Sequence, residues 1–212
     1  MKKLGNVYIM GDSLTTFKGY IPETHAPCYK PIMEDDNDVT DVNKTWWKIV
    51  LDNTESNLIL NDSWSGTTIC HTGYNGADYS NRSFVTRFDK LIDEKYFDDK
   101  QIDTVLIFGG TNDNWAQSPV GETKYENWTK EDLYKVLPAF CYLLDKVKKT
   151  LPTARVINIL NVDYRQPLVD GMIAASEHYG CDYWHLTTYN RRTGHPGAEG
   201  MAQIAEQILN FI

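Results

Sequence analysis

The sequence predicts an α/β fold in which a parallel sheet carries helices on both faces, and three observations support this prediction. Short runs of β-branched and aliphatic residues alternate along the chain with longer segments of helical periodicity. Strands that alternate with helices form parallel sheets, whose two faces the connecting helices cover. The chain has 212 residues, 42% hydrophobic and 24% charged, which suffices for one hydrophobic core, so a single domain over residues 1–212 is expected.

Five segments have the composition of buried strands, because each is short, aliphatic or β-branched, and bounded by turn or polar residues. In chain order the predicted strands are Val7–Met10, Asn57–Leu60, Thr104–Phe108, Arg155–Leu160 and Asp182–Leu186.

Five helices are predicted between and after these strands: Thr45–Asn53, Ser83–Ile92, Thr129–Lys149, Leu168–Tyr179 and Pro196–Ile212. Thr129 and Asp132 form an acidic variant of the capping box, which predicts the start of the third helix. Pro138 lies inside this helix, so we expect a kink or two shorter helices there. Arg82 and Arg87 are expected on a helix surface.

Long irregular segments follow the carboxyl ends of the first three predicted strands, at residues 18–44, 63–82 and 112–128. Segments of this length are uncommon as simple connections and are often functional. In open parallel sheets the ligand crevice lies at the carboxyl edge of the strands. The site is therefore expected at this edge, together with the loop after the fifth strand.

Four residues expected at this edge could together carry out acyl transfer. Ser13 follows the first strand, Gly66 the second, Asn112 the third and His195 the fifth. A serine hydroxyl becomes a good nucleophile when a neighbouring base takes its proton, and neutral histidine has a suitable pKa. The backbone amides of Ser13 and Gly66 and the side-chain amide of Asn112 could stabilise the resulting oxyanion.

The ordered motifs Gly11-Asp12-Ser13, Gly66, Gly110-Thr111-Asn112-Asp113 and His195-Pro196 resemble the four blocks of the SGNH (GDSL-type) hydrolase superfamily. The resemblance implies a three-layer α/β/α sandwich with a flavodoxin-like, parallel five-stranded sheet. It also implies a serine esterase, with Ser13 as nucleophile, His195 as base, and glycine plus asparagine as oxyanion donors. The superfamily includes lipases, thioesterases and carbohydrate deacetylases, and its mechanism needs neither a metal nor an organic cofactor.

One position departs from the superfamily pattern. The aspartate that usually stands three residues before the histidine and orients the imidazole is replaced by Arg192. Three alternatives remain open at this point: a backbone carbonyl holds the imidazole of His195, an amide such as that of Asn190 holds it, or the protein has lost activity. Loss of the acid lowers turnover in a serine protease by about 10⁴, yet residual catalysis persists.

Several acidic residues near these motifs are expected to serve structure. Asp12 and Asp113 are expected to hold turns through backbone amides, and Glu199 to favour the dipole of the last helix. The acidic run at residues 34–38 lacks the spacing of a calcium-binding loop and is expected to be solvated.

Aromatic residues near the motifs indicate which class of substrate could bind. Trp64 and Trp115 flank the glycine loop and Asn112, and Tyr74 and Tyr79 lie on the second long segment. These rings could provide a platform for a sugar, whereas core packing is an equally good alternative. Trp46 and Trp47 are assigned to core packing behind an N-cap at Thr45.

The net charge of −8 argues against nucleic acid or an anionic membrane as a partner, so a small-molecule or glycan ester is expected as substrate. Met1-Lys2-Lys3 is followed by too short an apolar run for an export signal, and the four cysteines show no paired spacing. We therefore expect a reduced, cytoplasmic protein without a bound metal, and the sequence does not indicate an oligomeric state.

The interpretation that accounts for most of these features is a serine esterase that hydrolyses small acyl esters, preferentially O-acetyl groups on carbohydrates, through an acyl-serine intermediate. A lipase or thioesterase for longer acyl chains is one alternative, and a non-catalytic glycan-binding homologue is another. A phosphate or nucleotide binder is disfavoured, because the Gly11-Asp12-Ser13 turn lacks the lysine of a P-loop and the glycine spacing of a dinucleotide fold.

Overall fold

A parallel five-stranded sheet forms the centre of the protein in a computed structural model that describes residues 3–33 and 37–212. The strand order is β2-β1-β3-β4-β5, and every neighbouring pair is parallel. The five strands are β1 (Asn6–Gly11), β2 (Asn57–Ser63), β3 (Thr104–Phe108), β4 (Arg155–Leu160) and β5 (Asp182–His185). All five predicted strands are thus confirmed, with shifted ends for three of them.

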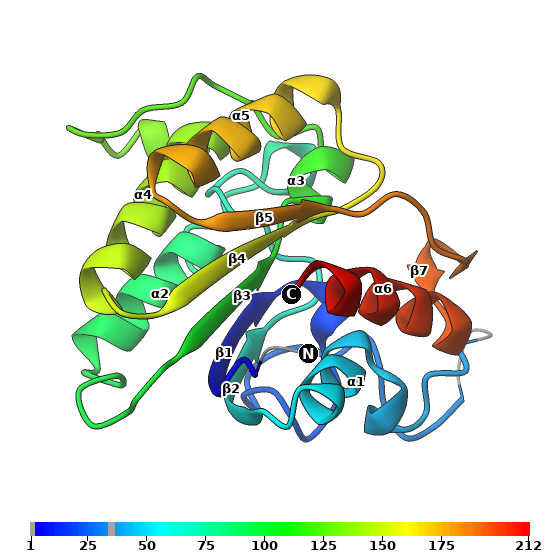
Figure 1. The fold of residues 1–212 in the computed structure, drawn as a ribbon. Helices are drawn as coiled ribbons and strands as arrows, with labels where there is room; N and C mark the ends of the chain where they lie inside the picture. The colour runs from blue at the N-terminus through cyan, green and yellow to red at the C-terminus, as the bar shows by residue number, and fades with distance from the viewer. Residues whose placement is uncertain (1–2, 34–36) are drawn as a thin grey trace.

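Helices cover both faces of this sheet and give the molecule three layers (Figure 1). Helices α1 (Trp46–Asn53) and α6 (Ala198–Phe211) pack on one face, and α2 (Phe84–Asp93), α4 (Val136–Thr150) and α5 (Gln166–His178) pack on the other. Each face has its own hydrophobic cluster. Trp46 and Trp47 are buried in the cluster under α1, as the sequence predicts. The predicted three-layer α/β/α architecture is confirmed.

Shorter elements lie mostly in the connections. They are η1 (Ser13–Thr15), η2 (Val42–Lys44), η3 (Tyr74–Gly76), α3 (Thr111–Trp115), η4 (Asp132–Tyr134), and a two-stranded antiparallel hairpin of β6 (Arg191–Arg192) and β7 (His195–Pro196). Most of these short elements belong to the long segments expected to line the site.

The predicted helix from Thr129 is wrong at its start. Thr129 and Asp132 do form the expected reciprocal box, with the Thr129 amide 2.8 Å from Asp132 Oδ2, but the box precedes only the single turn η4. The α-helix begins seven residues later at Val136, whose amide donates to the Pro119 carbonyl at 2.8 Å. Pro138 therefore lies in the first turn of α4, where its missing N–H breaks no helical hydrogen bond.

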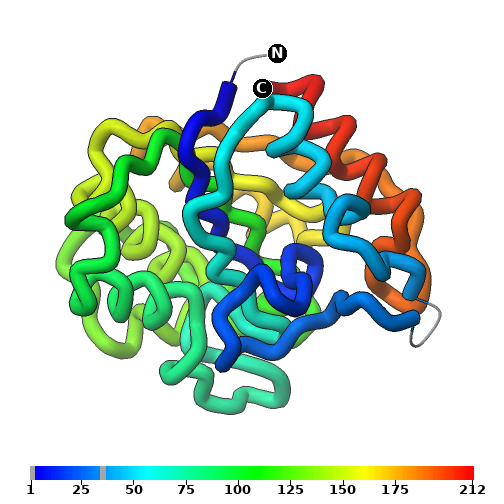
Figure 2. The backbone as a smooth tube through the Cα atoms, turned by 90° about the horizontal axis from the view of Figure 1, so that it is seen from below, coloured from blue at the N-terminus to red at the C-terminus, as the bar shows by residue number. Residues whose placement is uncertain are grey.

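The strand register places the ends of the central strands at one level. Gly11 of β1 pairs with Ser63 of β2 and with Phe108 of β3, so the chain leaves these three strands side by side. Figure 2 shows the segments that follow β1 and β2 next to each other, and the Ser65 amide donates to the Ala26 carbonyl at 3.0 Å. This edge of the sheet therefore gathers the segments that carry the predicted site.

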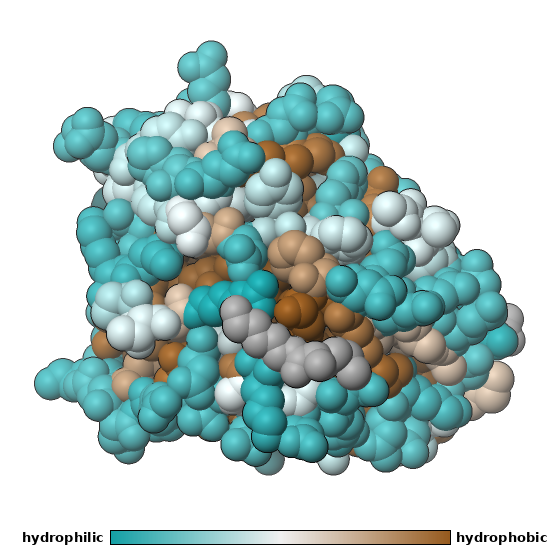
Figure 3. All heavy atoms as spheres, in the orientation of Figure 1, coloured by the Kyte–Doolittle hydropathy of each residue, from teal (hydrophilic) through white to brown (hydrophobic). Residues whose placement is uncertain are grey.

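Hydrophilic side chains predominate on the face shown in Figure 3, and hydrophobic atoms gather near its centre, where the C-terminus lies in the same view of Figure 1. Trp184 and Phe211, whose ring centroids are 5.1 Å apart, pack against the cluster under α6. Within the described ranges, no helix combines the length and apolar character needed to cross a membrane. Residues 34–36 of the acidic run lie outside the described residues.

Candidate active site

Ser13 lies in the turn that follows β1, at the carboxyl edge of the sheet. Asp12 caps the turn η1 by accepting a hydrogen bond from the Leu14 amide at 3.1 Å. A Cβ atom at Gly11 would lie 2.5 Å from the Thr15 Cβ, so the chain can turn here only with glycine. The capped turn therefore holds Ser13 in a fixed position. The residue is nearly buried, with 5% of its surface exposed.

The imidazole of His195 contacts the Ser13 hydroxyl directly, with 2.8 Å between Nε2 and Oγ. His195 begins β7, after a hairpin turn in which Thr193 and Gly194 have φ values of 44° and 88°. The left-handed conformation suits glycine but is uncommon for a β-branched residue, and it persists only where the surroundings fix it. The hairpin thus brings the end of the chain to the end of β1.

Three effects act on the pKa of His195. Burial lowers the pKa most, the nearby charge of Arg191 lowers it further, and a hydrogen bond with the Thr193 backbone raises it. The net effect is a pKa below the ordinary value of 6.5, so the imidazole is neutral near pH 7. Because Nε2 faces Ser13, Nδ1 is the nitrogen that can donate to the Thr193 carbonyl. That tautomer leaves Nε2 free to accept the serine proton.

The group that orients His195 differs from the aspartate of the superfamily pattern. Within the described ranges, no carboxylate acts on the imidazole, and Asn190 is exposed and does not act on it either. Arg192 directs its charge elsewhere, with Nη2 3.2 Å from Asp38 Oδ2. Of the two orienting groups that the sequence leaves open, the Thr193 backbone acts on the imidazole through a hydrogen bond that raises its pKa, and Asn190 does not.

Two backbone amides beside the serine are available to an oxyanion. Among residues 3–33 and 37–212, neither the Ser13 amide nor the Gly66 amide is paired with an acceptor. Gly66 has a φ of 75°, in the left-handed region that favours glycine, and follows β2 as predicted. Unpaired amides of this kind at a reaction site are suited to stabilise developing negative charge.

The side-chain amide of Asn112 completes this group. Asn112 lies in α3, which begins just after Gly110, a residue with a φ of 105°. Its Nδ2 donates to the Thr67 carbonyl at 2.9 Å, and its Oδ1 accepts from the Tyr74 hydroxyl at 2.8 Å. An amide nitrogen has two hydrogens, so one N–H remains for the pocket that Asn112 lines.

Asp12 and Asp113 hold the backbone around the site rather than facing the serine. Asp113 accepts from the amides of Ile69 and Cys70 at 2.8 and 3.2 Å, which fixes the segment that carries the Thr67 carbonyl. Burial raises the pKa of Asp12 to about 7 and that of Asp113 to about 6. Both acids therefore have the structural position that the sequence predicts.

A pocket of about 290 Å³ opens beside the serine, small for a ligand site. It is lined by Ser13, Pro27, Cys28, Ser65, Gly66, Tyr74, Asn112, Trp115 and His195. All four predicted reaction residues thus meet at one cavity. Tyr74 was singled out from the sequence only as an aromatic residue, and Pro27 and Cys28 were not, since nothing local in the sequence places their loop over the serine.

The two tryptophans proposed as a substrate platform have different positions. Trp115 lines the pocket, with its ring edge-on to that of His195 at a centroid distance of 5.9 Å. Trp64 is not among the lining residues and stacks on His25, with ring centroids 4.4 Å apart and an interplanar angle of 14°. One face of Trp64 is therefore covered by another ring.

The expectation that Arg87 lies on a helix surface is wrong. Arg87 is 5% exposed, and its Nη1 lies 2.9 Å from Asp62 Oδ2 at the end of β2. Its Nη2 donates to the Gly11 carbonyl at 3.2 Å, directly before the serine turn. Helical spacing places Arg87 with Phe84 and Phe88 on the buried side of α2, which is the signal in the sequence that could have indicated this position.

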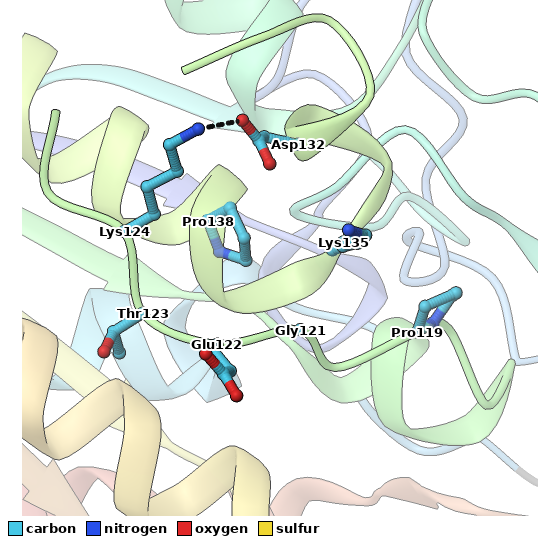
Figure 4. A pocket seen from close by; sticks show the side chains of 8 residues that line it. All are labelled: Pro119, Gly121, Glu122, Thr123, Lys124, Asp132, Lys135 and Pro138. Atoms are coloured by element: carbon cyan, nitrogen blue, oxygen red, sulfur yellow. Dashed lines mark hydrogen bonds and ion pairs between the residues drawn. The ribbon is translucent and has the colours of Figure 1, made fainter. Parts of the chain in front are cut away.

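A larger pocket of about 470 Å³ lies between the 119–124 segment and the start of α4 (Figure 4). Its charged side chains include Lys124 and Asp132, whose Nζ and Oδ2 atoms form an ion pair at 2.6 Å. It shares no lining residue with the serine pocket and contains neither a serine nor a histidine. We therefore assign the candidate site by its chemistry rather than by its size.

A three-layer α/β/α sandwich with a serine–histidine pair at the carboxyl edge of its sheet defines the class of SGNH-type hydrolases. The family model described as GDSL-like Lipase/Acylhydrolase matches residues 5–212, and the chain belongs to this family. Among curated proteins no significant match is found.

Solved structures show the same fold. A protein from Bacteroides ovatus described as a GDSL-like lipase is 43% identical, with a TM-score of 0.91 and coverage of 99% of this chain and 98% of that one. One from Bacteroides uniformis, described in the same words, is 40% identical, with a TM-score of 0.89 and coverage of 98% and 95%. An acetyl xylan esterase from the rumen bacterium Butyrivibrio proteoclasticus is 16% identical, with a TM-score of 0.64 and coverage of 100% and 64%, a likeness of fold alone.

Proposed function

We propose that this protein is a serine esterase that hydrolyses small acyl esters, preferentially O-acetyl groups on carbohydrates, through an acyl-serine intermediate. The observation that carries the proposal is the contact of 2.8 Å between His195 Nε2 and Ser13 Oγ, in a pocket beside the unpaired amides. This is the distance at which a general base takes a proton from its nucleophile.

In the first half of the reaction, His195 Nε2 takes the Ser13 proton while Oγ forms a bond to the acyl carbon. The carbonyl electron pair moves to oxygen, and the amides of Ser13 and Gly66 and the Asn112 side chain donate to this oxyanion. When the oxyanion collapses, the ester C–O bond breaks, and the imidazolium gives its proton to the leaving alcohol. Ser13 then carries the acyl group.

In the second half, water occupies the place of the alcohol. His195 takes one proton from the water as its oxygen attacks the acyl-serine carbon, and the same amides stabilise the second oxyanion. Collapse breaks the bond to Oγ, and the imidazolium returns the proton to Ser13. The products are the free carboxylic acid and the original enzyme, so the cycle needs no further reactant.

The preference for a small acyl group rests on the pocket of about 290 Å³, which is below the usual range of drug-sized ligand sites. An aromatic side chain, Trp115, lies at the pocket beside His195 and suits the apolar face of a sugar. The fold shared with an acetyl xylan esterase is in keeping with a carbohydrate ester.

Initial rates on p-nitrophenyl acetate, butyrate and octanoate, measured for the wild type and Ser13→Ala, test the proposal. We expect the rate to decrease as the acyl chain lengthens, and we expect Ser13→Ala to abolish hydrolysis. Ser80→Ala is the control, a change outside the pocket that should keep the wild-type rates. Acetate release from acetylated xylan and acetylated monosaccharides then tests the alcohol. A preference for octanoate would favour the lipase alternative, and sugar binding without any Ser13-dependent hydrolysis would favour a non-catalytic glycan-binding protein.

A further inference from the structure

We propose that Tyr74 is a positioning residue for the oxyanion site: its hydroxyl fixes the orientation of the Asn112 side-chain amide, so that an N–H of Asn112 faces the reacting carbonyl. The proposal rests on the esterase function proposed above and adds a residue that acts through Asn112. The distance from the Tyr74 hydroxyl oxygen to Asn112 Oδ1 is 2.8 Å.

The contacts around Asn112 determine which end of its amide is nitrogen. The Thr67 carbonyl lies 2.9 Å from one end, and a backbone carbonyl can only accept, so this end must be the NH₂ group. The other end is then Oδ1, and the Tyr74 hydroxyl must donate its proton to it. A flipped amide would place Oδ1 against the Thr67 carbonyl. The two contacts therefore select one orientation from opposite ends.

Donation from Tyr74 also strengthens the remaining N–H of Asn112 as a donor. A hydrogen bond to an amide oxygen draws electron density from its nitrogen, and hydrogen bonds in a chain polarise one another. Burial raises the pKa of Tyr74, so its phenol keeps this proton throughout the neutral range. The hydroxyl thus acts as a constant donor at every pH at which a neutral His195 can serve as base.

The loop that carries Tyr74 is held in place on both sides of the residue. Thr72 pairs with Asp78 across the loop, and its Oγ1 donates to the Tyr134 carbonyl at 2.7 Å. Ser118 Oγ donates to the Thr72 carbonyl, also at 2.7 Å. The contacts with Tyr134 and Ser118 come from segments distant in the sequence, so they hold the start of the Tyr74 loop against the rest of the fold.

A double-mutant cycle on p-nitrophenyl acetate tests the coupling between Tyr74 and Asn112. Loss of one oxyanion donor in Asn112→Ala is expected to lower kcat by about 10²–10³. Tyr74→Phe is expected to lower kcat by about tenfold with little change in KM, since a positioned donor acts on the transition state. In the Asn112→Ala background, Tyr74→Phe is expected to cause no further loss, because the amide on which it acts is absent.

Tyr79→Phe is the matched control, since Tyr79 lies in the same loop and its hydroxyl has no hydrogen-bond partner among the described residues. It should keep the wild-type kcat. Wild-type kcat in Tyr74→Phe, or an equal loss in the presence and absence of the Asn112 side chain, would overturn the proposal.

A second readout separates this proposal from the esterase function itself. The side-chain NH₂ signals of Asn112 in ¹H–¹⁵N spectra, assigned by their loss in Asn112→Ala, should shift in Tyr74→Phe and stay in place in Tyr79→Phe. This result is independent of turnover. If the wild type is inactive but the Asn112 signals move in Tyr74→Phe, the esterase function is refuted and the hydrogen bond is established. If the Asn112 signals do not move in Tyr74→Phe, the role of Tyr74 is refuted.

Discussion

Arg192 and Asp38 form an ion pair, 3.2 Å between Nη2 and Oδ2, that joins the segment after β1 to the hairpin bearing His195. The other oxygen of Asp38 accepts from the Ala198 amide at 2.8 Å, in the first turn of α6. Arg192 occupies the position where the superfamily has an aspartate. Asp38 thus contacts the side chain of Arg192, before His195 in the sequence, and the amide of Ala198, after it.

The two contacts of Asp38 should contribute unequally to stability. Asp38→Ala removes both, and loss of a side chain that caps a helix amide costs about 0.5–2 kcal/mol. Arg192→Gln removes the ion pair with Asp38 and keeps the contact with Ala198; this ion pair is solvent-exposed on the arginine side and worth about 1 kcal/mol or less. In urea unfolding, Asp38→Ala should therefore be less stable than Arg192→Gln. Asp38→Asn should be about as stable as Arg192→Gln, because an asparagine oxygen can still accept from the Ala198 amide. Equal losses for Asp38→Ala and Asp38→Asn would contradict a role at the start of α6.

The pH dependence of activity should reflect the buried position of His195. The imidazole must be neutral to accept the serine proton, so kcat/KM falls as pH decreases through its pKa, which lies below 6.5 because of burial and Arg191. A positive charge disfavours the imidazolium, so Arg191→Gln should move the inflection of a pH–rate profile to higher pH. Arg155→Gln, a change at the start of β4 and therefore at the edge of the sheet opposite the site, should leave it in place. An inflection at the same pH in the wild type and in Arg191→Gln would contradict the role of His195 as the base whose pKa Arg191 lowers.

Local patterns in the sequence predicted the strands, the two faces of the sheet and the edge where the site lies. They also predicted the four residues that meet at the pocket, because each follows a strand end and parallel strands end together. The predictions that were wrong concern residues whose positions depend on partners distant in the sequence. The Thr129–Asp132 box formed but did not start the α-helix, because the amides of Val136 and Leu137 pair with the 119–120 backbone.

The same limit applies to individual side chains at the site. The buried position of Arg87 depends on Asp62, from another strand, and Trp64 is covered by His25, from the loop after β1. Helical spacing indicates that Arg87 lies on the buried side of α2, but no pattern in the sequence indicates its partner Asp62 or the stacking of His25 on Trp64. The backbone partner of His195 was one of three open alternatives, because sequence specifies side chains and not which carbonyl a hairpin turn presents.

Asp12 should make the protein less stable as pH rises from about 4 to 7. Burial raises its pKa from 3.8 to about 7, so in this range the folded state binds more protons than the unfolded state. Stability is then lost with increasing pH, by up to about 1.4 kcal/mol per unit for this one group. Asp12→Asn keeps the acceptor for the Leu14 amide and removes the titration. The free energy of unfolding of Asp12→Asn relative to the wild type should thus increase between pH 4.5 and 7; parallel curves would contradict the raised pKa.

Arg87 should be among the most sensitive positions for folding. Arg87→Met leaves the carboxylate of Asp62, 5% exposed, without its guanidinium, and breaking a buried pair in this way costs about 3–5 kcal/mol. Arg82→Met is the matched control, because Arg82 only lies over the ring of Tyr79, a contact worth about 0.5–1 kcal/mol at an exposed site. Adding Asp62→Leu to Arg87→Met should recover much of the loss, since the uncompensated charge is then gone. Urea unfolding of the four proteins measures this, and an equal, small loss in both arginine variants would show that the pair does not support the serine turn.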